Sequence, residues 1–154
     1  MARRAQYDDV LGRIRLMLED ETDAVAIMAT VACELHGAFD HLSWTGFYRV
    51  TEPECLTVGP YQGSHGCLRI PFSRGVCGAA ARTRTPQLVP DVHAFEGHIA
   101  CSTATQSELV MPILNAAGDV LAVLDLDSEQ PAAFDDLDVA LLEPFCAWLG
   151  RRLQ

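Results

Sequence analysis

Long apolar runs are missing from this chain of 154 residues. Its first nine residues include two arginines and two aspartates, so they lack the apolar stretch of about 7–15 residues found in a signal peptide. No segment reaches the roughly 18 apolar residues of a membrane span. We therefore expect a cytoplasmic protein that does not contact a membrane. Repeats and linkers are missing too, and the hydrophobic content of 49% predicts one core and a single domain over residues 1–154.

Positive charge is scarce. Eleven Lys and Arg residues stand against 21 Asp and Glu residues, which gives a net charge of −10. A surface of this sign repels phosphate backbones and anionic lipids at long range. The charge balance argues against nucleic acid and membranes as partners.

Closely spaced cysteine pairs are also missing, although the chain holds six cysteines. Structural zinc sites use pairs about two to four residues apart, whereas Cys67, Cys77 and Cys101 are separated by ten and 24 positions. We expect no metal and no other cofactor. Cysteines of a reducing compartment are more often free or catalytic than permanently paired, so the pattern leaves thiol chemistry open.

Apolar residues recur at helical spacing near both ends of the chain. They predict two helices within residues 1–37, broken near Glu21 and Thr22, and a closing helix over residues 134–153. Pro144 lies in the middle of the last segment, where proline removes a hydrogen bond and clashes with the preceding turn. We expect a kink or two short helices there.

The central part of the chain changes to short runs rich in β-formers, and residues 44–128 are expected to form the sheet and its loops. A helix of small residues is expected to begin near Gly75 and to end before Pro86. This order predicts an α+β fold in which the N- and C-terminal helices pack on one face of an antiparallel sheet. Five or six strands are expected, at residues 44–50, 56–58, 68–72, 87–89, 109–114 and 120–126.

Cysteines, histidines and acids gather in residues 67–127, in loops and at strand ends where sites are commonly built. Cys77 lies at the start of the predicted small-residue helix, where the helix N-terminus lowers a thiol pKa. An unpaired cysteine is also among the most frequently buried residues, so both interpretations of Cys77 stay open. Cys101 follows an aperiodic segment, and a thiol in such a loop is better placed to react.

Other cysteines and histidines receive structural interpretations. Cys33, Cys55 and Cys146 are interpreted as structural because they lie on small-residue or apolar faces or outside the central motifs. His93 and His98 belong to the segment before Cys101. We interpret them as hydrogen-bonded loop histidines rather than as direct proton carriers.

Three acids lie at strand positions. Glu108 opens the strand at 109–114, and Asp125 and Asp127 alternate with leucines, so both aspartates project from one strand face. Acids beside apolar residues tend to have raised pKa values. A polar strand end that faces water would give the same pattern, and the two interpretations stay open.

Taken together, these residues resemble the free methionine-R-sulfoxide reductases, a branch of the GAF fold. The resemblance implies a single GAF-like domain and thiol-dependent reduction of free L-methionine-R-sulfoxide. It covers more than half of the chain, through residues 44–48, 59–63, 75–78, 91–101, 107–108 and 123–128.

The resemblance also implies a role for each site residue. Cys101 matches the thiol that attacks the sulfoxide and becomes a sulfenic acid, Cys67 matches the thiol that closes a disulfide, and Cys77 matches a third cysteine that serves as an alternative partner or assists recycling. A thioredoxin-type dithiol would be the reductant. The residues that match the family's substrate site are Trp44, Tyr48, Glu108, Asp125 and Asp127.

Two other functions fit the same fold. One is a non-catalytic GAF module that binds a small effector, since fold alone does not determine function. The other is a redox switch whose disulfide regulates a partner. Whether the chain acts as a monomer or a homodimer stays open.

Overall fold

The N-terminal segment forms two helices, α1 (Ala2–Met17) and α2 (Ala24–Ala38), as the periodicity predicts. The break falls where expected because Asp23 begins a new helix: its side chain accepts a hydrogen bond of 2.8 Å from the Ala26 N–H. The structure is a computed structural model that describes residues 2–99 and 101–154.

Six strands form one antiparallel sheet in the order β3-β2-β1-β6-β5-β4. This confirms the predicted α+β class and the upper strand count. Several strands extend one to four residues beyond the expected ranges, because backbone pairing with the neighbouring strand continues past the runs of β-forming residues. The strands are β1 (Leu42–Glu52), β2 (Cys55–Gln62), β3 (Arg69–Pro71), β4 (Gln87–Val89), β5 (Ser107–Leu114) and β6 (Val120–Ser128).

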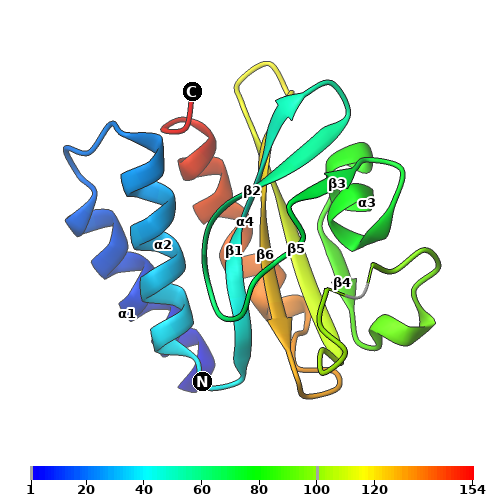
Figure 1. Cartoon of the computed structure of the whole chain (residues 1–154). Coiled ribbons are helices and arrows are strands. Elements are labelled where there is room, and N and C mark those ends of the chain that lie inside the picture. The colour runs from blue at the N-terminus through cyan, green and yellow to red at the C-terminus, as the bar shows by residue number, and fades with distance from the viewer. Residues whose placement is uncertain (1, 100) are drawn as a thin grey trace.

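Each face of the sheet is covered by different helices (Figure 1). Helices α1, α2 and α4 (Asp136–Gly150) bury one face, and the main apolar core lies between them and the sheet. The opposite face carries the short helix α3 (Gly75–Thr83) and a 3-10 turn, η1 (Val92–Ala94). The predicted packing of the terminal helices on one face is confirmed. The other face is left to α3 and the loops that hold the cysteines.

Helix α4 is continuous, so the expectation of two short helices at Pro144 is wrong. An interior proline costs about 3 kcal/mol, but two features of α4 offset that cost. Asp135 and Asp138 form a capping box at its first turn. Phe145 and Leu149 are fully buried against the sheet, which stabilises the helix by roughly 1.5–3 kcal/mol for each side chain.

The register of the three central strands determines which residues meet on the α3 face. Trp44 of β1 pairs with Asp127 of β6, and Asp127 pairs with Glu108 of β5. In the next row on that face, Gly46 pairs with Asp125. Because side chains alternate between faces along a strand, the three predicted acids and the tryptophan project to the same side. None of the described residues forms a helix with the length and apolar character needed to cross a lipid bilayer.

Candidate active site

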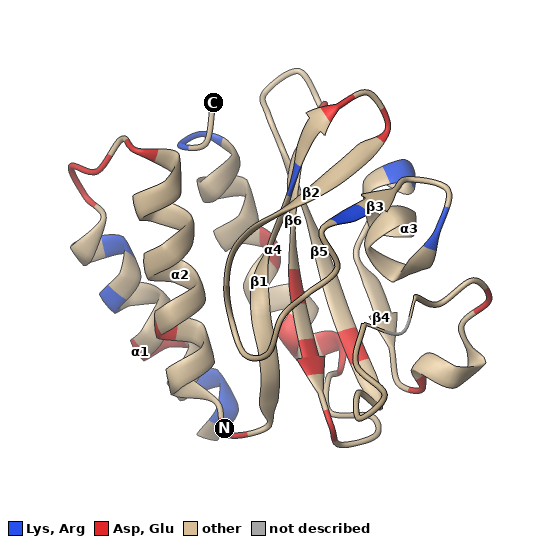
Figure 2. Ribbon diagram, viewed as in Figure 1, with Lys and Arg blue, Asp and Glu red and all other residues tan. Residues whose placement is uncertain are grey.

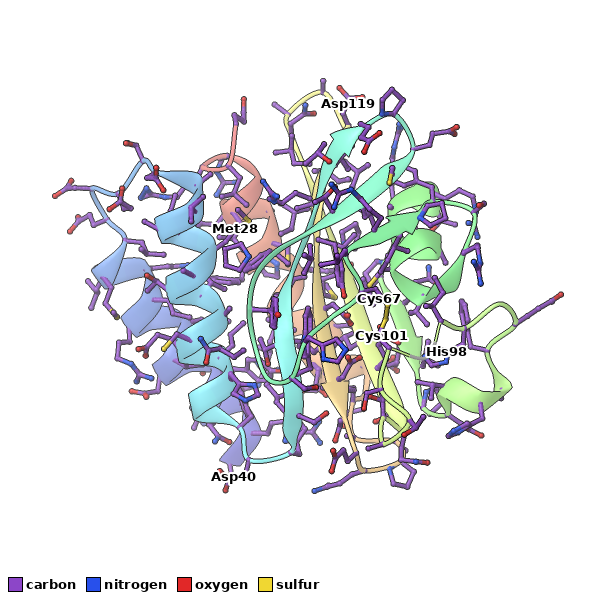
Figure 3. All side chains as sticks on the ribbon, viewed as in Figure 1. Met28, Asp40, Cys67, His98, Cys101 and Asp119 are labelled. Atoms are coloured by element: carbon purple, nitrogen blue, oxygen red, sulfur yellow. A yellow bond between two sulfur atoms is a disulfide. The ribbon has the colours of Figure 1, made fainter. Side chains whose placement is uncertain are left out.

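A disulfide joins Cys67 to Cys101 on the α3 face of the sheet (Figure 3). Their Cα atoms lie 5.8 Å apart, inside the usual range for a disulfide. Cys101 is exposed and Cys67 is half-buried. The disulfide implied by the resemblance is therefore present. It links two loops through cysteines that are 34 residues apart in sequence.

The loop that carries Cys67 packs on two aromatic rings. The Trp44 indole N–H donates a hydrogen bond of 2.8 Å to the Ser64 carbonyl. A Cβ added at Gly66 would lie 2.8 Å from the Tyr48 hydroxyl oxygen and 2.9 Å from the Trp44 ring. Glycine at this position thus lets the loop lie directly on the rings, which holds Cys67 near the sheet.

The loop that carries Cys101 is anchored at the start of α3. The Gly75 N–H donates a hydrogen bond of 3.0 Å to the Gly97 carbonyl. Gly75 has a φ of +70°, and a Cβ there would lie 3.1 Å from the Ile99 side chain, so glycine suits both the backbone and the contact. These contacts hold the loop beside the first turn of α3, where Cys77 lies.

Trp44 and Tyr48 form an aromatic wall, with ring centroids 5.6 Å apart and planes 22° apart. Tyr61 also stacks on Trp44, with ring centroids 5.1 Å apart, a contact that the sequence analysis missed. Gly46 makes room for the tryptophan, since a Cβ there would lie 2.7 Å from the Trp44 ring. The wall therefore depends on a glycine beneath it.

The three acids are largely withdrawn from water, with Glu108 and Asp125 buried and Asp127 half-buried. Glu108 is 6% exposed and Asp125 is 4% exposed. One oxygen each of Asp125 and Asp127 is buried without a hydrogen-bond partner among the described residues. The interpretation of a water-facing strand end is therefore wrong. Acidic residues mark neighbouring stretches of β5 and β6 as red ribbon segments in Figure 2, and Glu108 of β5 pairs with Asp127 of β6.

Burial raises the pKa of all three carboxyls. For Glu108 and Asp127, burial raises the pKa well above its usual range, and the charge of Asp125 raises it further. Burial also raises the pKa of Asp125. Carboxylates held this close cannot all ionise. This arrangement favours the protonated form of Glu108 and Asp127.

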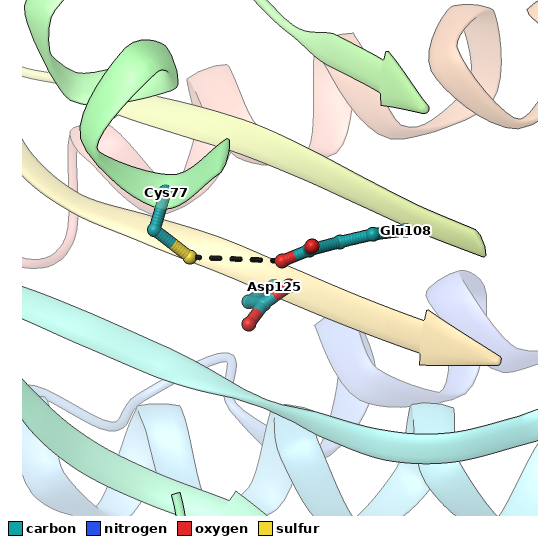
Figure 4. Close-up of side chains that lie close together, drawn as sticks. All are labelled: Cys77, Glu108 and Asp125. Carbon is teal, nitrogen blue, oxygen red and sulfur yellow. Dashed lines mark hydrogen bonds between the residues drawn. The ribbon is translucent and has the colours of Figure 1, made fainter. Parts of the chain in front are cut away.

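Cys77 faces the same acids. Its side chain is 4% exposed, and its Sγ lies 4.0 Å from the Glu108 Oε1 (Figure 4). Burial raises the pKa of the Cys77 thiol well above its usual range, and the charges of Asp125 and Glu108 raise it further. The buried interpretation is therefore the correct one, because loss of hydration and nearby negative charge outweigh the α3 dipole.

The pocket that joins these groups is lined by residues from β1, α3, β5, β6 and both cysteine loops. They include Trp44, Tyr48, Cys77, His98, Cys101, Glu108 and Asp127. The pocket brings together all the predicted site residues except Cys67 and Asp125. Those two contact it indirectly, as the disulfide partner of Cys101 and as a neighbour of Glu108.

Comparison with known proteins places this arrangement in a family. The GAF domain family matches residues 19–154. The free methionine-R-sulfoxide reductase of Escherichia coli is 37% identical over 147 residues, which cover 96% of this chain and 88% of that protein. The chain belongs to the free methionine-R-sulfoxide reductase branch of the GAF family.

Other free methionine-R-sulfoxide reductases and relatives agree with this membership. The structure of the Neisseria meningitidis reductase, solved in complex with its substrate, has a TM-score of 0.91 and 43% identity, and the match covers 96% of this chain and 87% of that one. Protein YtsP of Bacillus subtilis is 40% identical over 98% of this chain and 93% of its own length.

In this member of the free methionine-R-sulfoxide reductase family, His98 is a site residue that the sequence analysis undervalued. Its Nε2 lies 3.7 Å from the Glu108 Oε2, and its side chain is 16% exposed. Burial lowers the pKa of His98, as does the charge of His93. His93 itself is exposed and contacts Asp91 at 3.1 Å, as expected of a loop histidine. The sequence signal for His98 was only its position three residues before Cys101.

The remaining cysteines lie away from the pocket. Cys146 is buried, and burial raises the pKa of its thiol to about 12. Cys55 is half-buried. Cys33 is exposed, so the expected structural role does not apply to it. The exposed position makes Cys33 a suitable control for the pocket thiols.

A Glu108→Gln variant is expected to gain stability over the wild type as pH rises. The folded state holds the Glu108 proton more tightly than the unfolded chain, where a glutamate ionises near pH 4.3. The stability that protonated Glu108 gives the folded state is therefore complete below that pH. This stability is lost as pH rises through the raised pKa of Glu108 in the folded state. Urea unfolding at pH 5, 7 and 9 should show a stability difference that grows by about 1 kcal/mol or more.

The matched control is Glu96→Gln, because Glu96 is exposed. Its stability curve should run parallel to that of the wild type. Histidines that do not contact Glu108 contribute equally to all three proteins, so only the differences are compared. A constant difference between the Glu108→Gln variant and the wild type across this range would contradict the raised pKa.

Proposed function

We propose that the protein reduces free L-methionine-R-sulfoxide to methionine through a sulfenic acid on Cys101 and a disulfide between Cys101 and Cys67. The observation that supports this best is the position of the disulfide, which closes over a pocket floored by buried acids and bounded by the Trp44 ring. Thiols, an acid and an apolar wall are the groups that such a reduction needs.

The sulfur chemistry follows from the two linked thiols. The Cys101 thiolate attacks the sulfoxide sulfur and the sulfoxide oxygen takes up one proton. The substrate S–O bond then breaks as the hydroxyl passes to the Cys101 Sγ, which leaves a sulfenic acid on Cys101 and releases methionine. The Cys67 thiol then condenses with the sulfenic acid, which forms the disulfide and releases water. A thioredoxin-type dithiol reduces the disulfide by thiol exchange and is itself oxidised. Exposure of Cys101 gives such a reductant access.

The proton comes from one of the carboxyls in the pocket. A sulfoxide oxygen leaves poorly until it is protonated, so a group that keeps its proton near neutral pH is required. Glu108 and Asp127 line the pocket, and burial raises the pKa of both. Asp125 lies beside them, and its negative charge helps them keep their protons.

Substrate recognition uses the two ends of a free amino acid. An ionised carboxylate of the acid cluster holds the ammonium group, and Trp44 with Tyr48 buries the methyl end. The first turn of α3 has no side-chain cap, so the N–H groups that follow Gly75 in this turn can receive the substrate carboxylate. Both charged ends of the substrate would then have partners.

N-acetylation of the substrate should lower activity at least about 100-fold. Acetylation removes the ammonium, so the acids of the site stay buried without their partner, and the loss amounts to ~3 kcal/mol or more. The S epimer should also fail, because its oxygen points away from the acid. The test is sulfoxide consumption with a thioredoxin system, measured side by side on the free R, free S and N-acetyl-R compounds.

Equal rates on the free and acetylated R compounds would rule out ammonium recognition. The same assay separates catalysis from a redox switch, which uses the same disulfide. A switch would release at most one equivalent of methionine per protein, whereas an enzyme releases many. A non-catalytic sensor would release none.

A further inference from the structure

Cys77, Glu108 and Asp125 present donor atoms to one point at the floor of the pocket. The Cys77 Sγ and one oxygen from each carboxyl all lie within 4.8 Å of one another, and Sγ is 4.0 Å from the Glu108 Oε1 (Figure 4). Donor atoms around a tetrahedral zinc ion are about 3.3–3.5 Å apart. Small side-chain rotations would close the three donors around one ion.

The burial of these groups is a second, independent observation. All three residues are buried, and the Asp125 Oδ1 has no hydrogen-bond partner among the described residues. A buried carboxylate without a partner is unfavourable. A bound dication would supply the missing partner, and it would offset the negative charge that the three groups carry together when ionised.

The donor types favour one kind of metal. A thiolate with carboxylates suits Zn²⁺, whereas Ca²⁺ and Mg²⁺ are held by oxygen donors alone. His98 lies nearby, with its Nε2 3.7 Å from the Glu108 Oε2, but its imidazole is outside the group of donor atoms that lie within 4.8 Å of one another. The thiolate and the two carboxylates therefore supply three zinc ligands and leave the fourth position open.

We propose that Cys77, Glu108 and Asp125 bind Zn²⁺ at the floor of this pocket as three protein ligands. The spacing of the cysteines argued against zinc, but these donors come from α3, β5 and β6, and only the fold brings them together. A second consequence rests on the proposed function. Zinc would occupy the place of the substrate ammonium, and it would inhibit the enzyme by competition with free methionine-R-sulfoxide.

The test uses the full-length protein in its disulfide form, so that Cys67 and Cys101 offer no thiolate. Cobalt(II) replaces zinc as a probe, because a thiolate ligand gives a sulfur-to-cobalt charge-transfer absorption. We expect this band in the wild type and its loss in Cys77→Ser. Zinc affinity, measured against a chromophoric chelator, should fall at least about 10-fold in Cys77→Ser and in Asp125→Asn.

Cys146→Ser and Cys33→Ser are the matched controls, one buried and one exposed, and both should keep the band and the affinity. A band that persists in Cys77→Ser, or one that disappears in either control, would overturn the proposed site. If Cys77→Ser does not fold, the loss of zinc affinity in Asp125→Asn carries the test. Unchanged affinity in that variant would also overturn the site.

Competition is measured separately. Zinc should raise the KM for free methionine-R-sulfoxide and leave kcat unchanged, whereas a change in kcat alone would contradict competition. The two proposals can fail independently. A protein that reduces the sulfoxide but gives no cobalt band contradicts only the zinc site, and a protein that gives the band but reduces nothing contradicts only the proposed function.

Discussion

Cys101→Ser is expected to abolish sulfoxide reduction even in a single turnover, because a serine hydroxyl is not ionised at neutral pH and cannot replace the thiolate. Cys67→Ser should still form about one equivalent of methionine, since the attacking thiol remains. Without its partner, Cys101 should accumulate as a sulfenic acid. The measurement is methionine formed per protein after rapid mixing, with the sulfenic acid trapped by a selective nucleophile and detected by mass.

Two cysteines outside the pocket serve as controls for this prediction. Cys33→Ser places a hydroxyl on an exposed position and should change neither turnover nor stability. Cys146→Ser buries a hydroxyl, which should cost ~1–3 kcal/mol of stability if the hydroxyl finds no partner, while the single-turnover rate stays normal. Multiple turnover by Cys101→Ser would refute the assignment of the attacking thiol.

Glu108→Gln should lower the single-turnover rate by about 100-fold to 10,000-fold, the range of general acid catalysis, if Glu108 is the proton donor. The substitution keeps the size of the side chain and removes its acidity. In the wild type the rate should fall as pH rises through the raised pKa of the donor, because the deprotonated acid has no proton to give. The variant should lack this fall.

Asp127→Asn and Asp125→Asn distinguish the roles within the acid cluster. Asp127 also lines the pocket, so it is the alternative donor and would then show the larger loss. Asp125 is the deeper group, and its substitution should act mainly on KM by weakening ammonium binding. Glu96→Gln, at an exposed position, should leave the rate unchanged. Wild-type rates in all three pocket variants would refute acid catalysis by this cluster.

Local pattern determined the elements of the fold, and the resemblance to the free methionine-R-sulfoxide reductases pointed to most of the predicted site residues. The capping aspartate before α2, the β-rich runs and the glycine at the start of α3 depend on neighbours within a few residues, so the chain shows them directly. Alternation along β6 likewise shows that Asp125 and Asp127 share a face. At Pro144 one of the two expected outcomes, a pair of short helices, does not occur, because the burial that offsets the cost of proline comes from contact with the sheet.

Only the tertiary structure decided the chemistry of these side chains. Whether Asp125 faces water, whether the Cys77 thiol is acidic, and whether His98 reaches Glu108 all depend on contacts between α3, β5, β6 and the loop before Cys101. These segments are distant in sequence and meet only in the folded chain. A pKa depends on hydration and on the charges within a few ångströms, and a sequence states neither. The residue types were readable from the chain, while their protonation states came from packing.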